Sequence, residues 1–353
     1  MRGVPLFDRI ADLPLTVESH ALDNMEREVS SGFLRRTTIV RLRGQGSEGV
    51  GEDVVYTAEM HPPFQAMSEG LPLEGTWTIA SFSSHVRGLD LFGQELDHGV
   101  YRNYRQWAFE SAALDLALRQ AGLSLPGVVG REARPVTFVV SLRLGEPPSL
   151  DPIRERLAIA STLHFKLDAT SSWDEALIAE LRDTGAVSSI DFKGAYHGTV
   201  VDQPPDPVLY GRVAEGLPGV WLEDPALTPE IDVLLKPYRD RITWDAPINS
   251  VADIENLPFP PRTVNVKPSR FGTLEALFAT YDYLDEHGIG GYGGGQFELG
   301  PGRGQIQALA SVFHPDGAND IAPGGYNDPH PKPGLPSSPL PGGVVETGFG
   351  WIS

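Results

Sequence analysis

The chain has 353 residues, of which 41% are hydrophobic and 21% are charged, as is ordinary for globular proteins. Its formal net charge of −19 opposes binding to nucleic acid or to an anionic membrane, because no basic segment offsets the repulsion from phosphate groups. The absence of cysteine excludes disulfides, thiolate zinc sites and cysteine nucleophiles, while the length favours one large domain with a smaller one.

The N-terminal part of the chain is expected to mix strands and helices. It lacks the apolar core of a signal peptide, and no segment of the sequence reaches transmembrane length, so a cytoplasmic protein is expected. Strands are predicted in the runs PLTVESHAL, TTIVRLRG and DVVYTAEM. From Tyr101 the pattern becomes helical, and Gly122 is placed to end that helix.

From about Val136 onward, segments typical of strands and helices alternate. The predicted strands are 137–142, 163–169, the four runs that end at Asp191, Glu223, Asp245 and Lys267, then 288–300 and a weak strand within 318–326. Ser172 and Glu175 have the spacing of a capping box, and Thr228 with Pro229 is a typical helix start. Eight strand–helix units predict an α/β protein with a (β/α)₈ TIM-type barrel over residues 131–327.

Each of four short apolar runs ends in one ionisable residue: Asp191, Glu223, Asp245 or Lys267. The last three follow one another at intervals of 22 residues, about the length of one strand plus one helix. Because a barrel gathers its catalytic residues at the C-terminal ends of its strands, these side chains are expected to converge. A single aspartate at a strand end is usually a helix cap or a loop residue. Their recurrence on successive strands instead favours a Mg²⁺ site beside a lysine that removes a proton from carbon.

This series resembles the enolase superfamily, in the branch of muconate lactonizing enzyme and o-succinylbenzoate synthase. WLEDPA is similar to that family's Glu-x-Pro strand, VNVKPSRFGTL to its lysine strand, and QFELGPGRG, with Glu298, to its seventh strand. The resemblance covers nearly the whole chain. It implies an α+β capping domain over residues 1–130, the barrel, a tail at 328–353 that returns to the cap, and a homo-oligomer. It also implies that Asp191, Glu223 and Asp245 bind Mg²⁺ and that Lys267 is an acid/base.

The second barrel strand departs from the family pattern. The family has Lys-x-Lys there, whereas this chain reads His164-Phe165-Lys166-Leu167-Asp168, with one lysine. Either Lys166 is the first lysine and Asp168 replaces the catalytic one, or the register slips by two and His164 and Lys166 fill the two places. The slipped register is slightly preferred, because it leaves more chain for the helix before Asp191.

Two further departures concern the third and fifth strands. Lys193 stands where the family commonly has asparagine, and Ala246 where it commonly has glutamate. Lys193 could neutralise a metal ligand, replace the missing lysine, or point to solvent or a loop carboxylate. Glu298 could polarise the substrate or bond to a neighbour. Arg270 could bind a substrate carboxylate, although an arginine here is more often at the surface.

The expected function is Mg²⁺-dependent removal of a proton α to a carboxylate, through a metal-stabilised enediolate of a small carboxylate substrate. The outcome would be β-elimination or cycloisomerisation. The catalytic candidates are Lys267, Lys166, Asp168 and Glu298. Racemisation needs a base on each face, so the loss of one lysine counts against it. The alternative is a barrel that has lost catalysis and serves as a metal-binding or ligand-binding protein.

Overall fold

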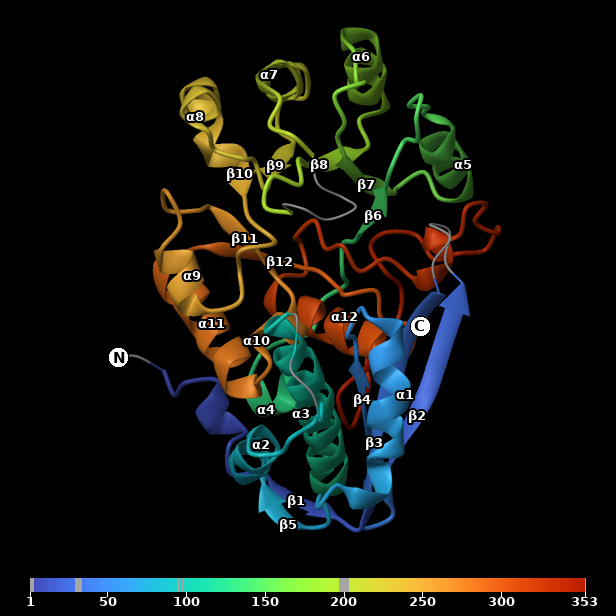
Figure 1. Cartoon of the computed structure of the whole chain (residues 1–353), viewed down its shortest axis with the longest axis vertical. Coiled ribbons are helices and arrows are strands. Elements are labelled where there is room, and N and C mark those ends of the chain that lie inside the picture. The colour runs from blue at the N-terminus through green and yellow to red at the C-terminus, as the bar shows by residue number, and fades with distance from the viewer. Residues whose placement is uncertain (1–2, 29–33, 94–95, 97, 197–202, 353) are drawn as a thin grey trace.

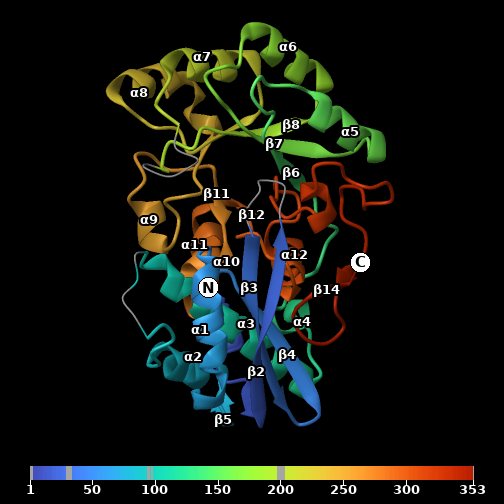
Figure 2. The ribbon, with the colours of Figure 1, turned by 45° about the vertical axis from the view of Figure 1, so that its right-hand side comes forward.

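The computed structural model describes residues 3–28, 34–93, 96, 98–196 and 203–352. The N-terminal sheet and helices α1–α4 form one end of the molecule, and strands β6–β10 with helices α5–α8 form the other (Figure 1). Strands β11 and β12 with helices α9–α12 lie between these ends, and the C-terminal segment runs alongside them (Figures 1 and 2). Among the described residues no helix is both long enough and apolar enough to cross a membrane.

The N-terminal end is built on an antiparallel sheet in the order β2 (Ser19–Glu28), β3 (Leu34–Gly44) and β4 (Ser47–Asp53). Its other elements are β1 (Pro14–Val17) paired with β5 (Gly75–Thr78), and the helices α1 (His61–Ala66), α2 (Ile79–Arg87), α3 (Val100–Ala121) and α4 (Leu125–Val129). Strand β4 packs closely on α3, because a Cβ added to Gly51 would lie 2.0 Å from the Ala108 carbonyl oxygen.

Two predictions for this end have different outcomes. The end of α3 at Gly122, which has a left-handed φ of 65°, confirms the predicted helix stop. The predicted strand over DVVYTAEM is wrong, because β4 ends at Asp53 and residues Ala58–Met60 form a 3₁₀ helix.

Beyond the N-terminal end, the chain forms parallel strands that lie side by side in chain order. Five of them form one sheet: β6 (Val139–Leu142), β7 (His164–Asp168), β8 (Val187–Asp191), β9 (Trp221–Glu223) and β10 (Ile242–Thr243). Strands β11 (Thr263–Val266) and β12 (Gly290–Gly293) form a second parallel pair. The Asn265 amide donates to the Trp244 carbonyl at 2.9 Å, just beyond β10. The weak strand predicted within 318–326 appears as two isolated parallel bridges, Asn319 with Phe138 and Asp320 with Gly294.

A helix follows most of these strands. They are α5 (Asp151–Ile159), α6 (Glu175–Thr184), α7 (Pro207–Gly216), α8 (Pro229–Leu235), α9 (Val251–Glu255), α10 (Pro268–Phe271), α11 (Leu274–His287) and α12 (Pro301–Phe313). Thr228 caps α8 by accepting from the Ile231 amide, as predicted. The predicted capping box at Ser172 is wrong, because Asp174 is the N-cap of α6. Asp174, directly before the helix, accepts a hydrogen bond from the Leu177 amide, which is the bond expected of an N-cap side chain.

Two buried charged side chains join the N-terminal sheet to the loop between β12 and α12. Arg35 is fully buried and donates to the carbonyls of Val54 and Val55 on one side and of Gln296 and Phe297 on the other. Glu52 of β4 accepts hydrogen bonds from the amides of Leu299, Gly300 and Gly302. Since Gly300, the N-cap of α12, has no side chain, Glu52 of the N-terminal sheet caps this helix.

The C-terminal segment contacts both ends of the molecule. The Gly348 amide donates to the Leu123 carbonyl at 2.8 Å, and the Phe349 amide donates to Asp115 of α3 at 2.7 Å. Farther upstream, the Leu340 amide donates to the Val136 carbonyl just before β6. The segment also carries the short strands β13 (Gly343–Val344) and β14 (Trp351–Ile352).

Burial of His314 predicts a loss of stability in acid. Its ring contacts Tyr281 and Asn319, and burial lowers its pKa from 6.5 to about 4. Between these values the unfolded chain binds a proton that the folded chain does not, so stability falls as the pH drops through this window. We expect up to about 3 kcal/mol from this residue. Urea unfolding at several pH values measures it. His314→Gln should lose less stability than the parent over that window.

Candidate active site

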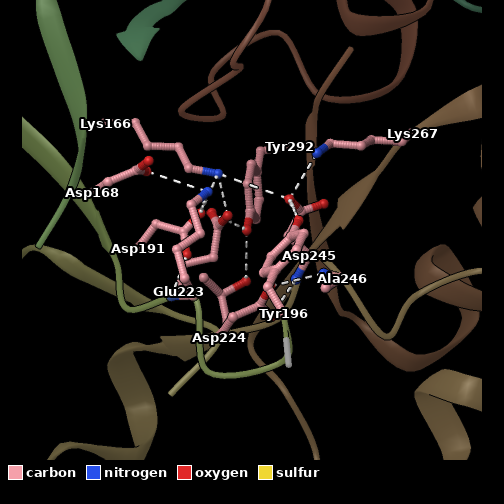
Figure 3. Close-up of polar contacts among 12 residues, drawn as sticks. Lys166, Asp168, Asp191, Tyr196, Glu223, Asp224, Asp245, Ala246, Lys267 and Tyr292 are labelled. Atoms are coloured by element: carbon pink, nitrogen blue, oxygen red, sulfur yellow. Dashed lines mark hydrogen bonds and ion pairs between the residues drawn. The ribbon is translucent and has the colours of Figure 1, made fainter. Parts of the chain in front are cut away.

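The ionisable residues at the predicted strand ends converge on one buried cluster (Figure 3). Asp191 ends β8 and Glu223 ends β9, while Lys267 directly follows β11. Asp245 lies two residues beyond the short strand β10. Each of these four residues is at most 7% exposed. The structure therefore brings together the four ionisable residues that the sequence places at strand ends.

Lys166 of β7 lies among three of the carboxylates. Its Nζ hydrogen-bonds to Oε1 of Glu223 and lies 3.2 Å from Oδ2 of Asp191 and 3.9 Å from Oδ2 of Asp245. Burial alone would lower the pKa of Lys166, but the three carboxylates outweigh it and raise that pKa well above its ordinary value. These contacts therefore favour the protonated form of Lys166.

Asp245 is the most strongly paired carboxylate of the cluster. Its Oδ2 accepts from Lys267 Nζ at 2.7 Å, and its Oδ1 accepts from Arg270 at 2.8 Å. These cations outweigh the effect of burial and lower the pKa of Asp245 far below its usual range. Burial lowers the pKa of Lys267 in spite of Asp245, and the positive charge of Arg270 adds to that effect. Arg270 is 6% exposed, so the expectation of a surface arginine is wrong.

The β7–β8 ladder bears on the two alternatives for the second strand. Asp168 pairs with Asp191 and Lys166 with Ser189, whereas His164 is exposed at the far end of β7. His164 therefore lies outside the cluster. The residue count preferred the slipped register, in which His164 and Lys166 fill the two places, but the ladder does not favour that register. The ladder favours Lys166 as the first position of the Lys-x-Lys pattern and Asp168 as the second.

Lys193 points into the cluster. Its Nζ lies 2.5 Å from Oδ2 of Asp191 and 3.2 Å from Oδ1 of Asp168, and its side chain is 14% exposed. Its backbone has a left-handed φ of 55°, held by a hydrogen bond from its amide to Oδ1 of Asp191. Both carboxylates raise the pKa of Lys193 in opposition to burial. Of the alternatives for this residue, the solvent-facing one is excluded.

Glu298 takes a different place. It follows β12 by five residues, and its Oε1 accepts from the Gln296 amide at 2.7 Å while its Oε2 lies 3.4 Å from Arg303. These contacts, together with the neighbouring Glu52, put Glu298 at the junction with the N-terminal sheet. Of its two predicted roles, the described contacts show hydrogen bonding to a neighbour.

Three further residues take part in the site but were not singled out from the sequence. Asp224 accepts from the amides of Asp245 and Ala246, both at 2.8 Å, and so fixes the chain after β10. Tyr292 of β12 donates to Oε2 of Glu223 at 2.7 Å. The Tyr196 hydroxyl lies 3.5 Å from Asp245. A second acid beside Glu223 was the available signal for Asp224. The alternation of β12 offered only a weak signal for Tyr292, because that strand is mostly glycine.

The donor set of the cluster fits a hard divalent cation. Asp191, Glu223 and Asp224 are buried and each offers an oxygen within 4.8 Å of the other two. Lys166 links Asp245 to Asp191 and Glu223. Carboxylate oxygens are the ligands that Mg²⁺ prefers. Asp224 is the third acid of this group by distance, and its two oxygens accept the amides of Asp245 and Ala246. Both oxygens of Asp245 are paired as well, with Lys267 and Arg270.

Comparisons with known proteins give two kinds of match. Family models described as the N-terminal and C-terminal domains of domain of unknown function DUF8230 match residues 8–128 and 132–328. No curated protein matches the chain.

Solved structures match over most of the chain. An enolase superfamily member from Listeria innocua is 19% identical with a TM-score of 0.64, covering 87% of this chain and 86% of that one. An isomerase from Streptomyces coelicolor is 18% identical with a TM-score of 0.65, covering 86% and 87%. Muconate cycloisomerase from Pseudomonas fluorescens is 19% identical with a TM-score of 0.59, covering 87% of each chain. At these identities the likeness establishes the fold.

Proposed function

The chain belongs to the family described as domain of unknown function DUF8230 and has the fold of the enolase superfamily, and from this premise we propose that it is an enzyme that removes a proton α to a carboxylate. The substrate is a small carboxylate, and the outcome is β-elimination or cycloisomerisation. The observation that carries the proposal is the buried cluster in which Lys267 meets Asp245 beside Asp191 and Glu223.

The proposed framework is a (β/α)₈ barrel over residues 131–327 with a cap formed by residues 1–130. Two observations support closure of the barrel. The Asn265–Trp244 hydrogen bond connects β11 to the end of β10, and the bridges at Asn319 and Asp320 connect β12 back to β6. A closed barrel brings the ends of all its strands to one face, where the cluster lies.

Within this proposal Asp191, Glu223 and Asp245 hold Mg²⁺. The metal, when bound, would polarise the substrate carboxylate and so make the neighbouring C–H bond more acidic. The positive charges of Lys166, Lys193 and Arg270 attract the same carboxylate to a chain that is acidic overall.

Lys267 is the proposed base. A neutral amine is needed to accept a proton from carbon, and the lowered pKa of Lys267 favours that form. Arg270 and Lys267 share Asp245, so Arg270 fixes the carboxylate that orients the lysine. Asp168 stands at the position on the second strand where the family has an acid/base lysine, and it is paired with Lys193. Lys267 is then the one lysine of this chain at a position where the family has an acid/base lysine.

Exchange of α-protons with solvent tests the proposal directly. We expect the protein with Mg²⁺ in deuterated water to replace the α-proton of at least one member of a panel of small carboxylates by deuterium, because removal of that proton is the proposed step. Proton NMR follows the loss of the α-proton signal, with boiled protein as the control. Binding of a panel member without any exchange would favour the alternative, a barrel that binds a metal or ligand without catalysis.

A further inference from the structure

The ammonium group of Lys166 lies at the place where a metal would be expected. It hydrogen-bonds to Glu223 and lies 3.2 Å from Asp191 and 3.9 Å from Asp245, the three carboxylates assigned above to Mg²⁺ (Figure 3). Lys166 itself is 2% exposed. The oxygens it approaches, Oε1 of Glu223 and Oδ2 of Asp191, belong to two of the three acids that each offer an oxygen within 4.8 Å of the others.

Buried carboxylates need a positive charge close by. Removing an ionised carboxylate from water costs several kcal/mol or more unless a cation compensates it. In this cluster the compensation comes from the chain itself, since Lys166 and Lys193 contact Asp191, and Lys267 and Arg270 contact Asp245. Glu223 is the exception, because Lys166 is the one cationic side chain that contacts it among the described residues.

We propose that Lys166 is the resident cation of the carboxylate cluster and that a divalent metal enters only by displacing its ammonium group from Glu223 and Asp191. The inference rests on the carboxylates being the metal site of the proposed function. Two consequences follow. The folded site is assembled without metal, and its affinity for Mg²⁺ is lower than the same carboxylates would have if Lys166 were neutral.

Calorimetric titration of Mg²⁺ into the metal-free full-length protein tests the competition. Lys166→Met removes the ammonium group but keeps an unbranched side chain of similar length, and we expect it to bind Mg²⁺ at least about ten-fold more tightly than the parent. The matched control is Lys236→Met, at an exposed position on the outer helical layer. It makes the same change in net charge and should leave the affinity within about two-fold of the parent.

Thermal unfolding gives a second measurement that does not depend on activity. In a chelator, Lys166→Met should unfold at a lower temperature than Lys236→Met, because Glu223 is left without its cation. Added Mg²⁺ should restore much of that loss, whereas the parent should gain less from the same concentration. If Lys166→Met does not fold, the double variant Lys166→Met with Glu223→Gln removes one charge of each sign and should fold without metal.

The outcomes separate this inference from the proposed function. A parent that exchanges α-protons but whose Lys166→Met variant binds Mg²⁺ no more tightly would overturn only the displacement of Lys166. Tighter binding by Lys166→Met in a protein that exchanges no α-proton would support the resident cation and overturn the function. Absence of Mg²⁺ binding to both proteins would overturn the metal site and the competition together.

Discussion

Lys267→Met is expected to lower the rate of α-proton exchange by at least about a thousand-fold, within the range that a positioned base contributes. Lys267 is 7% exposed and its Nζ lies 2.7 Å from Asp245. Methionine fills much of the same space but cannot accept a proton. The exchange assay in deuterated water measures the loss, on the panel member that the parent exchanges.

The fold should survive this change, because Asp245 keeps its contact with Arg270 at 2.8 Å. A circular dichroism spectrum and a melting temperature close to those of the parent would show that the protein remains folded. The Lys236→Met variant, which removes an exposed lysine, should exchange at the parent rate. An unchanged exchange rate in Lys267→Met would mean that another group is the base.

Of the proposed variants, Asp53→Ala is expected to lose the most stability, with the free energy of unfolding falling by about 3–5 kcal/mol. Asp53 and Arg105 are each at most 1% exposed and their ion pair measures 2.9 Å. Removing the aspartate leaves the Arg105 guanidinium in the interior, between the rings of Phe64 and Phe92, without a charged partner among the residues that the structure describes. Urea unfolding monitored by tryptophan fluorescence measures the change.

Two variants show whether the unpaired charge is the cause. Asp53→Ala combined with Arg105→Met removes both partners and should recover part of the lost free energy. Asp23→Ala removes a carboxylate that is 50% exposed from a surface ion pair with Arg41, and should cost less than about 1 kcal/mol. Equal losses for Asp53→Ala and Asp23→Ala would contradict the role given to burial.

The sequence predicts that the carboxylates and Lys267 lie near one another, because residues at the ends of successive parallel strands recur at the spacing of the strand–helix units. Glu223, Asp245 and Lys267 are separated by equal intervals of 22 residues, and each interval spans one strand–helix unit although the strands and helices differ in length. This remains true although β10 contains only two residues and Asp245 lies beyond it. The prediction depended on the repeat and not on the exact bounds of any strand.

The contacts of the second and third strands could not be obtained from spacing. The ladder between β7 and β8 shifts register between Phe165 and Lys166, so counting residues between Lys166 and Asp191 misjudges which residue faces which. Lys193 enters the cluster through a left-handed backbone, which lysine rarely adopts and which no hydrophobic pattern signals. The role of Asp224 depends on two amides more than 20 residues away.

The capping of α12 by Glu52 joins the two family segments through hydrogen bonds. A polypeptide limited to residues 132–328 would lack the acceptor for three amides at the start of α12 and the Arg35 donor for the carbonyls of Gln296 and Phe297. The loop so affected carries Glu298 and leads away from β12, the strand of Tyr292. An N-terminal segment transplanted from another protein of this fold would therefore have to supply its own counterparts of Arg35 and Glu52 to hold the loop after β12 in place.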